Sequence, residues 1–302
     1  MLPFSRVAVI GLGLIGSSIA RAVRQHMPTV HLTAHDADPA VRARVIELGI
    51  VDDVADTPGA AVVDADLVML CVPVGAIGSA AEAIAADLPA DAIVSDVGGA
   101  KLSVSEAMRK ALPNALIVPG HPVAGTEHSG PDAGFATLFH GRWCILTPEE
   151  GTSEAAVERV KAFWEKLGSH VEIMTARHHD LVLAVTSHVP HLIAYSIVGT
   201  ASDLEDVTQG EVIKYSAGGF RDFTRIAASD PTMWRDVFLN NREAVLEILQ
   251  RLTEDVTALQ RAIRWGDGDT LFNLFTRTRA IRRSIIEQGQ DDARPDFGRT
   301  HE

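Results

Sequence analysis

VAVIGLGLIG, residues 7–16, is an apolar run followed at once by three glycines in the spacing GxGxxG. The run predicts a buried strand, and the glycines predict the turn between this strand and a helix. The first glycine allows the bend, the second lets a pyrophosphate approach the backbone, and the third lets the helix pack on the strand. Free amides at the start of the helix then face the phosphates. The residues expected to bind a dinucleotide here are Gly11, Gly13, Leu14, Ile15 and Gly16.

Asp36 is expected to determine which dinucleotide binds. It follows the next predicted strand, Val30–Ala34, and comes twenty residues after Gly16, with no arginine immediately beside it. A carboxylate there accepts hydrogen bonds from the ribose hydroxyls and repels a 2′-phosphate, so the sequence favours NAD over NADP. Val72 and Pro73, at the end of a third predicted strand, are expected to line the same site.

Apolar strands alternate with amphipathic helices from Val7 to about Thr175. The strands are expected at residues 7–10, 30–34, 67–72, 92–96, 115–118, 143–146 and 171–174. Most are continuous apolar runs, as in parallel strands that are covered on both faces. Helices are expected at Pro39–Leu48 and Ser153–Leu167, each followed by a glycine suited to a C-cap. The pattern predicts an α/β fold, with a doubly wound Rossmann-type domain over residues 1–176.

The second half is expected to be entirely helical, over residues 177–288. Helices are expected at 178–200, near 220–228, at 231–264 and at 270–287, with Asp230 as the N-cap of the third. The long helix carries apolar residues at alternating spacings of four and three, namely Val245, Leu249, Leu252, Val256, Leu259 and Ile263. Such a seam suits packing along another helix, although a core helix gives a similar pattern. Residues 289–302 are polar and aperiodic, and we expect a disordered tail.

The length, composition and net charge argue against several classes of function. The 302 residues suffice for two domains, and no apolar run is expected to reach the ~18 residues of a membrane span. Only six residues precede the first strand, so no cleavable signal is expected. Cys71 and Cys144 lie in apolar runs and are expected to be buried free thiols, as in the cytoplasm. The net charge of −13 argues against nucleic acid and anionic membranes as partners, and an anionic substrate would need a local positive cluster.

His121 is the candidate catalytic residue. It lies in the segment GHPVAGTE, residues 120–127, after the predicted strand Ala115–Val118. A histidine on a loop held by proline and glycine, beyond a strand of a dinucleotide-binding sheet, is placed where such sheets carry out chemistry. It can accept the proton released when an alcohol is oxidised with a nicotinamide cofactor. A structural hydrogen bond is the alternative interpretation.

Three further motifs carry polar groups. The segment DVGGAK, residues 96–101, ends a strand, and its glycines allow a ring to approach. The segment TSHVPH, residues 186–191, places His188 and His191 beside a proline that should kink the helix. Together with His178, His179 and Asp180 these raise the possibility of a metal, but no familiar ligand spacing is completed and we expect none. The loop AGGFRDFTR, residues 217–225, offers Arg221 and Arg225 as a carboxylate clamp, or as surface arginines.

Taken together, these segments resemble one family. GLGLIGSSIA, DVGGAK, GHPVAGTEHSG, TSHVPH, GGFRDFTRIA and SDPTMWRDVFLNN follow, in order and spacing, the prephenate/arogenate (cyclohexadienyl) dehydrogenases, the TyrA family. The resemblance implies a Rossmann domain, a helical dimerisation domain that forms a homodimer, and NAD-dependent oxidative decarboxylation of a cyclohexadiene acid in tyrosine biosynthesis. It implies that His121 accepts the hydrogen bond of the ring hydroxyl and that Arg225 binds a substrate carboxylate. It further implies a pocket lined by His191, Ser187, Thr126 and Glu127, with Trp234 approaching from the partner subunit.

One position departs from the family pattern. The family's loop commonly reads DxGSxK, and its serine touches the region of the substrate hydroxyl and the nicotinamide, whereas Gly99 stands here. Two alternatives to the family remain. A β-hydroxyacid dehydrogenase would be expected to carry a lysine on the first helix of the second half, and residues 178–200 contain none. A non-catalytic NAD-binding sensor would not need His121, His191 and Arg225 together.

Overall fold

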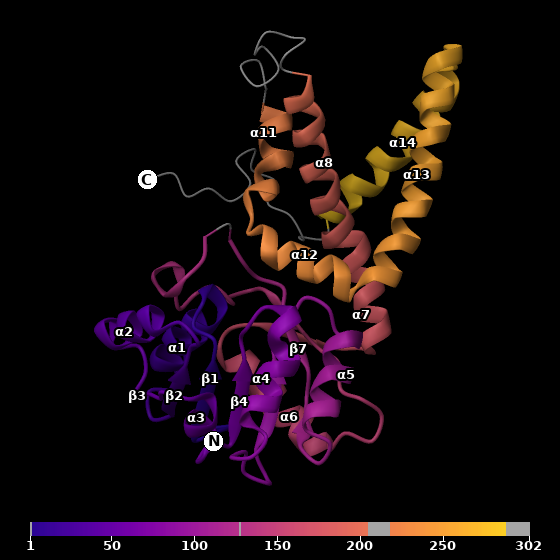
Figure 1. Ribbon diagram of the computed structural model, residues 1–302. Coiled ribbons are helices and arrows are strands. Elements are labelled where there is room, and N and C mark those ends of the chain that lie inside the picture. Colours follow the sequence, from indigo (N-terminus) through magenta and orange to yellow (C-terminus); the bar gives the residue numbers. More distant parts are fainter. Residues whose placement is uncertain (1, 127, 205–217, 288–302) are drawn as a thin grey trace. The chain divides into compact units, whose positions relative to one another are not determined.

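The computed structural model describes residues 2–126, 128–204 and 218–287 (Figure 1). These residues belong to two compact units, Met1–Leu246 and Glu247–Glu302. The first unit contains every described strand and the helices that surround them. The division after residue 176 marks the end of the strands, and as a domain boundary it stays a prediction.

A six-stranded parallel sheet forms the base of the first unit, in the strand order β3-β2-β1-β4-β5-β6. Its strands are β1 (Arg6–Ile10), β2 (His31–His35), β3 (Asp53–Val54), β4 (Leu67–Leu70), β5 (Ile93–Asp96) and β6 (Leu116–Ile117). The doubly wound Rossmann-type fold is therefore confirmed, and of the strands in this sheet only the two-residue β3 was not predicted from the sequence. Because the strands are parallel, the segments that follow β1, β2, β4 and β5 meet at one edge.

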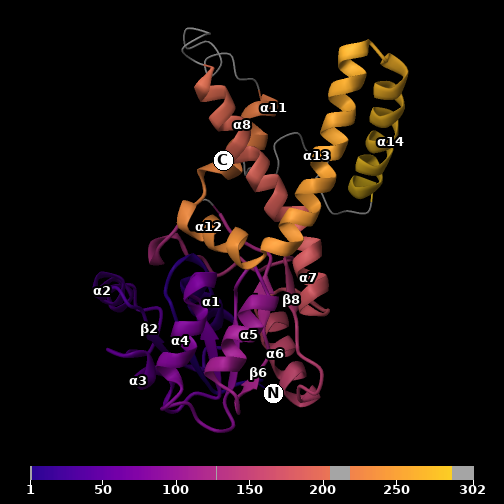
Figure 2. The same ribbon diagram turned by 45° about the vertical axis from the view of Figure 1, so that its right-hand side comes forward.

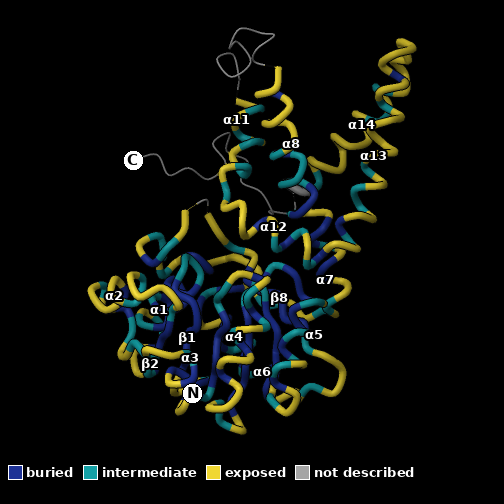
Figure 3. Tube along the Cα trace, viewed as in Figure 1, coloured by how far each residue is buried: buried dark blue, intermediate teal, exposed yellow. Residues whose placement is uncertain are grey.

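The two faces of this sheet bury two separate cores. Val7 and Val9 of β1 belong to one core, together with the helices at residues 14–26 and 154–166. Ala8 and Ile10 belong to the other core, together with the helices at residues 58–62, 77–84 and 102–111. This alternation is the period-two side-chain geometry of a strand that is covered on both faces. Figure 3 shows the strands as the buried layer between more exposed helices.

The helices of this half connect the strands, and several of them have capping residues. They are α1 (Leu14–His26), α2 (Pro39–Leu48), α3 (Pro58–Val62), α4 (Ile77–Ile84), α5 (Leu102–Ala111) and α6 (Glu154–Lys166), with short turns η1 (Val74–Ala76) and η2 (Pro131–Ala133). Gly49 ends α2 in the left-handed conformation at φ 61°, and the Ser153 hydroxyl accepts the Ala156 amide at the start of α6.

A second, three-stranded sheet corrects the expected topology. β7 (Gly120–Pro122) pairs antiparallel with β8 (Trp143–Leu146), which pairs in parallel with β9 (His170–Ile173). The last two strands therefore do not extend the first sheet. His121 lies within β7 opposite Ile145, and not on a loop beyond a strand as the sequence predicted. The three-residue strand is too short to give a recognisable pattern.

The helical segments that follow are more broken than predicted. α7 (Ala176–Leu183) runs into a π-helical turn, η3 (Ala184–His188), and then into α8 (Val189–Asp203). Pro190 lies in the first turn of α8, and its missing amide accounts for the irregular turn before it. Then follow α11 (Gly218–Thr224), η4 (Arg225–Ala228) and α12 (Pro231–Asn240), with Asp230 capping α12 through the Met233 amide at 2.8 Å.

The single long helix expected at 231–264 is two helices. Asn241 ends α12 in a non-helical conformation, and α13 (Arg242–Trp265) begins after it. Gly266 at φ 69° ends α13, and α14 (Gly268–Glu287) runs back in the opposite direction (Figure 2). The predicted tail 289–302 lies outside the described residues.

One helical stretch is more apolar than the sequence analysis recognised. Among the described residues, the run Ala176–Asp203 alone is long and apolar enough to cross a membrane by length and composition, although His and Ser residues interrupt it.

Both cysteines are free, with Cys144 buried and Cys71 partly exposed.

Candidate active site

The glycine loop has the geometry of a dinucleotide-binding turn. Gly11 has φ 97°, and a Cβ there would lie 2.5 Å from the Cys71 carbonyl oxygen. A Cβ on Gly16 would collide with the Gly11 carbonyl oxygen, so this glycine brings α1 against the loop. A Cβ on Gly13 would meet nothing within 4 Å, and no side chain caps the helix that starts after it. The open space at Gly13 and the uncapped amides fit a pyrophosphate.

Asp36 supports this loop directly. Its Oδ2 accepts the Leu12 amide at 2.7 Å, and its Oδ1 accepts the Asp38 amide at 3.0 Å. The carboxylate thus lies at the end of β2 beside the glycines, where a ribose would reach its remaining lone pairs. α2 also brings Arg42 close to it, which the sequence spacing did not indicate. The Arg42 guanidinium donates to the Asp36 carbonyl oxygen at 2.7 Å.

The neighbouring strand end completes the cofactor side of the site. Val72 follows β4, and its Cγ1 would lie 3.0 Å from a Cβ on Gly11. Pro73 comes next, is exposed, and precedes the turn η1. Both predicted residues therefore lie at the same edge of the sheet as the glycine loop.

A buried ion pair holds the backbone on which the candidate base sits. Asp96 ends β5, and its Oδ2 accepts from Lys101 Nζ; both side chains are fully buried. Asp96 Oδ1 accepts the Gly120 amide at 3.2 Å, and Lys101 Nζ donates to the Gly120 carbonyl oxygen at 2.7 Å. Both backbone groups of the residue before His121 are thus fixed by one pair of charges. Burial lowers the pKa of Lys101, and the Asp96 carboxylate opposes that shift.

His121 is joined to two buried residues of α7. Its Nδ1 lies 2.8 Å from His179 Nε2, and His179 Nδ1 lies 2.8 Å from Asp180 Oδ1. Asp180 also accepts the Lys101 amide at 2.7 Å and the Leu102 amide at 2.9 Å, at the start of α5. A continuous row of hydrogen bonds therefore runs from the start of α5 through α7 to His121.

The environment of His121 favours the neutral imidazole. Burial lowers its pKa well below the usual range, and the neighbouring His179 and Lys101 lower it further. Burial also lowers the pKa of His179, which the Asp180 carboxylate partly offsets. A neutral imidazole is the form that can accept a proton.

Gly99 lies beside His121 Nε2, the ring nitrogen that does not face His179. A Cβ on Gly99 would lie 3.7 Å from His121 Nε2 and 3.8 Å from Val237 Cγ2, which are ordinary contact distances. His188 is buried next to it, hydrogen bonds the Gly99 backbone, and has its pKa lowered to about 4, chiefly by burial. The Asn241 side-chain amide donates to His188 Nδ1 at 3.0 Å and to the Asp180 carbonyl oxygen at 2.8 Å.

Trp234 and His191 lie beside His188. Their rings stack with centroids 3.6 Å apart, and His188 meets the same indole edge-on at 6.0 Å. Trp234 is 7% exposed and lies against histidines of its own chain, so the expectation that it approaches from a partner subunit is not needed to place it here. Burial lowers the pKa of His191, and the Arg225 guanidinium lowers it further, which puts that cation near the ring.

Comparisons with known proteins identify the family to which this arrangement belongs. Residues 19–173 match the nucleotide-binding domain family of prephenate dehydrogenase, and residues 175–277 match the prephenate dehydrogenase dimerization domain family. The chain belongs to the prephenate dehydrogenase family. The resemblance inferred from the motifs is thereby confirmed, together with the Rossmann-type fold.

Individual relatives of this prephenate dehydrogenase family member cover nearly its whole length. Cyclohexadienyl dehydrogenase of Zymomonas mobilis is 44% identical over 98% of this chain and 100% of that protein. Prephenate dehydrogenase of Bacillus subtilis is 33% identical over 92% of this chain and 76% of that protein. The crystal structure of prephenate dehydrogenase from Aquifex aeolicus, in complex with hydroxyphenyl propionate and NAD⁺, superposes with a TM-score of 0.87 at 32% identity. The superposition covers 93% of this chain and 98% of the Aquifex aeolicus chain.

The structure gives less information on the remaining residues that were predicted to line the substrate pocket. Ser187 is half-buried in η3, and its carbonyl oxygen accepts from His191 Nδ1 at 2.8 Å. Thr126 is exposed, and its hydroxyl accepts the His128 amide at 3.2 Å. Arg225 is exposed on η4, while Glu127 lies outside the described residues. Their roles toward a substrate stay predictions.

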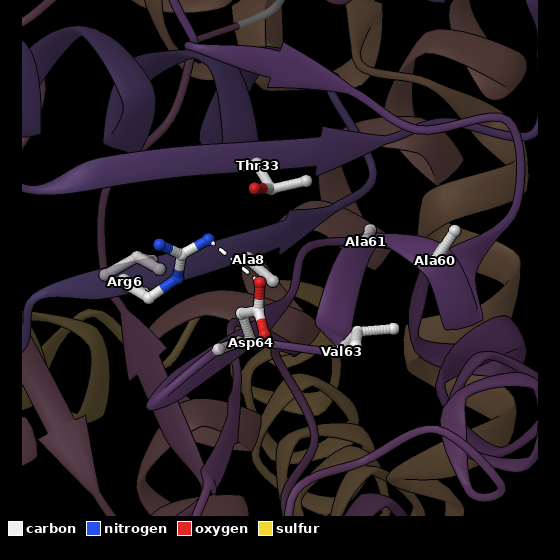
Figure 4. A pocket seen from close by; sticks show the side chains of 9 residues that line it. Arg6, Ala8, Thr33, Ala60, Ala61, Val63 and Asp64 are labelled. Atoms are coloured by element: carbon white, nitrogen blue, oxygen red, sulfur yellow. Dashed lines mark hydrogen bonds and ion pairs between the residues drawn. The ribbon is translucent and has the colours of Figure 1, made fainter.

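One further feature lies away from this site. A small pocket at the start of β1 is lined by Arg6, Thr33 and Asp64 among others, with Arg6 Nη2 3.1 Å from Asp64 Oδ2 (Figure 4). It opens at the amino end of β1, and no predicted site residue lines it. Within the described ranges, no group of three or more His, Cys, Asp or Glu side chains is arranged to hold a metal ion.

The sequence analysis missed the buried residues that support His121. Lys101 was assigned no role from the sequence, and His179, Asp180 and His188 were considered only as possible metal ligands. The structure joins them by hydrogen bonds to the backbone or side chain of the site. The sequence carried only a partial signal, the gathering of histidines and an aspartate within residues 178–188. That these groups are buried, and therefore must be paired, is visible only in the structure.

Proposed function

We propose that this chain catalyses the NAD-dependent oxidative decarboxylation of prephenate, arogenate or both, in tyrosine biosynthesis. The products are 4-hydroxyphenylpyruvate from prephenate and tyrosine from arogenate. The observation that carries the proposal is the position of His121 Nε2 beside Gly99, at the edge of the sheet where the glycine loop also lies. Membership of the family over both of its domains supports the same chemistry.

The cofactor side is proposed to bind NAD. The glycine loop and the start of α1 would hold the pyrophosphate, Asp36 the adenosine ribose, and Val72 and Pro73 the segment next to it. When bound, the nicotinamide supplies the oxidising power by accepting a hydride from the substrate carbinol carbon. Every further step depends on groups of the substrate and the protein.

His121 is proposed to accept the proton of the ring hydroxyl at Nε2. As the carbinol carbon loses its hydride and becomes a carbonyl, the C–C bond to the ring carboxylate breaks. Carbon dioxide leaves, and the electron pair of that bond enters the ring, which becomes an aromatic phenolate. The phenolate oxygen then takes a proton back from the His121 imidazolium and becomes the phenol. Aromatisation makes the step effectively irreversible. The protein contributes orientation and a neutral base at the hydroxyl.

The substrate side is proposed to hold a dianionic or zwitterionic acid. Arg225 would bind a carboxylate, because the chain is acidic overall and an anion needs a local cation. His191, Ser187, Thr126, Glu127 and Trp234 are the other proposed lining residues. The chain is further proposed to act as a homodimer through its helical half, in line with the matched dimerization domain, and to work in the cytoplasm.

The comparisons give no support to the alternative of another two-domain hydroxyacid dehydrogenase. Residues 176–203 contain no lysine, which that chemistry would be expected to place on this helix. A non-catalytic sensor gains no support either, because the imidazole row behind His121 has no purpose in binding NAD alone.

The decisive assay compares the two acids side by side. The purified protein is incubated with NAD and either prephenate or arogenate, and reduced nicotinamide and carbon dioxide are measured together. We expect equal amounts of both products from at least one acid. A folded protein that binds NAD but reduces none of it with either acid would overturn the proposal.

A further inference from the structure

The hydrogen bonds behind His121 determine which of its ring nitrogens carries the proton. We propose that His179 and Asp180 are positioning residues that hold His121 as the Nδ1–H tautomer, leaving the Nε2 lone pair toward the substrate. The assignment of Nε2 as the proton acceptor rests on the proposed function. The tautomer itself rests on the hydrogen-bond geometry of the protein.

Asp180 is the fixed end of the row. Its carboxylate accepts the Lys101 amide at 2.7 Å and the Leu102 amide at 2.9 Å, where α5 begins. Free amides and the positive end of a helix stabilise a carboxylate, and both amides can only donate. The side chain is almost completely buried, so it has little access to water as a substitute partner. Asp180 therefore acts as an acceptor toward its third neighbour.

The hydrogen bond to Asp180 determines which ring nitrogen of His179 carries the proton. Its Nδ1 lies 2.8 Å from Asp180 Oδ1 and must carry the proton that the carboxylate accepts. A neutral imidazole protonated on Nδ1 has a lone pair on Nε2. That Nε2 lies 2.8 Å from His121 Nδ1 and can only accept, so His121 Nδ1 must donate. His179 is 0% exposed, and water has no access to replace it.

The result is a single orientation for His121. With its proton on Nδ1, its basic nitrogen is Nε2, the atom that lies 3.7 Å from the Cβ position of Gly99. The opposite tautomer would set two acceptors against each other in a buried place, which is unfavourable. A carboxylate that fixes the tautomer of a catalytic histidine is an established device of enzymes, and here a second imidazole stands between the two.

The test uses two substitutions that differ in one property. His179→Gln offers a side-chain carbonyl that can still accept from His121 Nδ1, whereas His179→Leu offers no acceptor. The neighbouring His178 is exposed, so His178→Gln is the matched control. We expect His179→Leu to lower kcat at least ~10-fold with KM within about 3-fold, and His179→Gln to stay within about 3-fold of wild-type kcat.

The tautomer is measured independently of activity. Nitrogen-15 NMR of the imidazoles at neutral pH should show the free wild-type protein with His121 protonated on Nδ1, and His179→Gln should keep this pattern. A wild-type His121 protonated on Nε2, or normal kcat in folded His179→Leu, would overturn the inference. If His179→Leu does not fold, the NMR spectra of wild type and His179→Gln decide. Full activity in His121→Asn would instead refute the proposed role of His121, with the tautomer still testable.

Discussion

Gly99 stands where the sequence resemblance leads us to expect a serine, and the structure shows that the position has room. A Cβ there would make only ordinary contacts with His121 and Val237, and the backbone is not in the left-handed region. A serine hydroxyl would come close to His121 Nε2, which is where the substrate hydroxyl is proposed to bind. The glycine therefore removes a polar group without removing a steric conflict.

Gly99→Ser should fold normally and lower KM for the better substrate about 5-fold. The reason is one added hydrogen bond to the substrate hydroxyl, worth about 1 kcal/mol. Gly99→Ala, which adds the Cβ without the hydroxyl, is the control and should leave KM within about 2-fold of wild type. Equal KM values in both variants would mean that the hydroxyl is already satisfied without a side chain at this position.

At the scale of single residues, the sequence predicted His121 but not its supports. His121 stands in a recognisable motif, so its chemistry could be inferred from the residues around it. His179 lies 58 positions away, and only the packing of α7 beside β7 brings the two rings together. Lys101 was equally ambiguous, because nothing local distinguishes a solvated lysine in the first turn of a helix from one buried against Asp96.

At the scale of elements, two glycines of the same loop have different roles. Gly16 contributes to the stability of the fold, and Gly13 to binding of the cofactor. Gly16 is crowded by the Gly11 carbonyl oxygen, while Gly13 faces open space. Gly16→Ala should therefore destabilise the fold by roughly 1–3 kcal/mol, as overpacking does. Gly13→Ala should leave the free energy of unfolding nearly unchanged and weaken NAD binding at least ~10-fold, because the methyl group occupies the place of the pyrophosphate.

Urea unfolding and calorimetric NAD titration of the two variants measure these effects. A Gly13→Ala protein that binds NAD as tightly as wild type would contradict the placement of the pyrophosphate. Wild-type stability in Gly16→Ala would contradict the packing of α1 on the loop.

The sequence predicted the long, strongly patterned elements and missed the short ones. Continuous apolar runs such as β1 and β4, and helices with clear caps such as α2, are determined locally. β7 is defined only by its pairing with β8, and the break at Asn241 by the contacts of that side chain with α7 and η3. Such tertiary contacts leave no periodic signal in the chain.

At the scale of the whole molecule, α13 tests the proposed dimer. Of its seam residues, Ile263 is 68% and Val256 54% exposed, so a charge at Ile263 need not disturb the fold of one chain. Ile263→Asp should convert the dimer to monomer at micromolar concentration, because it would bury an unpaired charge in the interface. Ala258→Asp, on another face of the same helix, is the control. A dimeric Ile263→Asp protein in light scattering would place the interface elsewhere.

The buried histidines make the fold sensitive to acid. His188 has its pKa lowered to about 4, so an unfolded chain binds a proton near pH 6.5 that the folded chain does not. This contribution to stability is present above pH ~6.5 and is lost as the pH falls toward ~4. For His188 alone it amounts to about 3 kcal/mol, and His121 and His179 shift in the same direction.

Urea unfolding between about pH 7.5 and about pH 5 should show this loss. His178→Gln should leave the slope unchanged, since that side chain is exposed. A free energy of unfolding that stays constant over this range would mean that these imidazoles bind protons equally in the folded and unfolded protein.

The most direct test of the account is the kcat of His121→Asn. Asparagine keeps a polar group of similar size but cannot accept the proton, so kcat should fall roughly 10²–10⁴-fold while the affinity for NAD stays nearly unchanged. A folded His121→Asn enzyme that retains more than about a tenth of the wild-type kcat would contradict the account, because a loss of less than ~1.4 kcal/mol is too small for the base of this reaction.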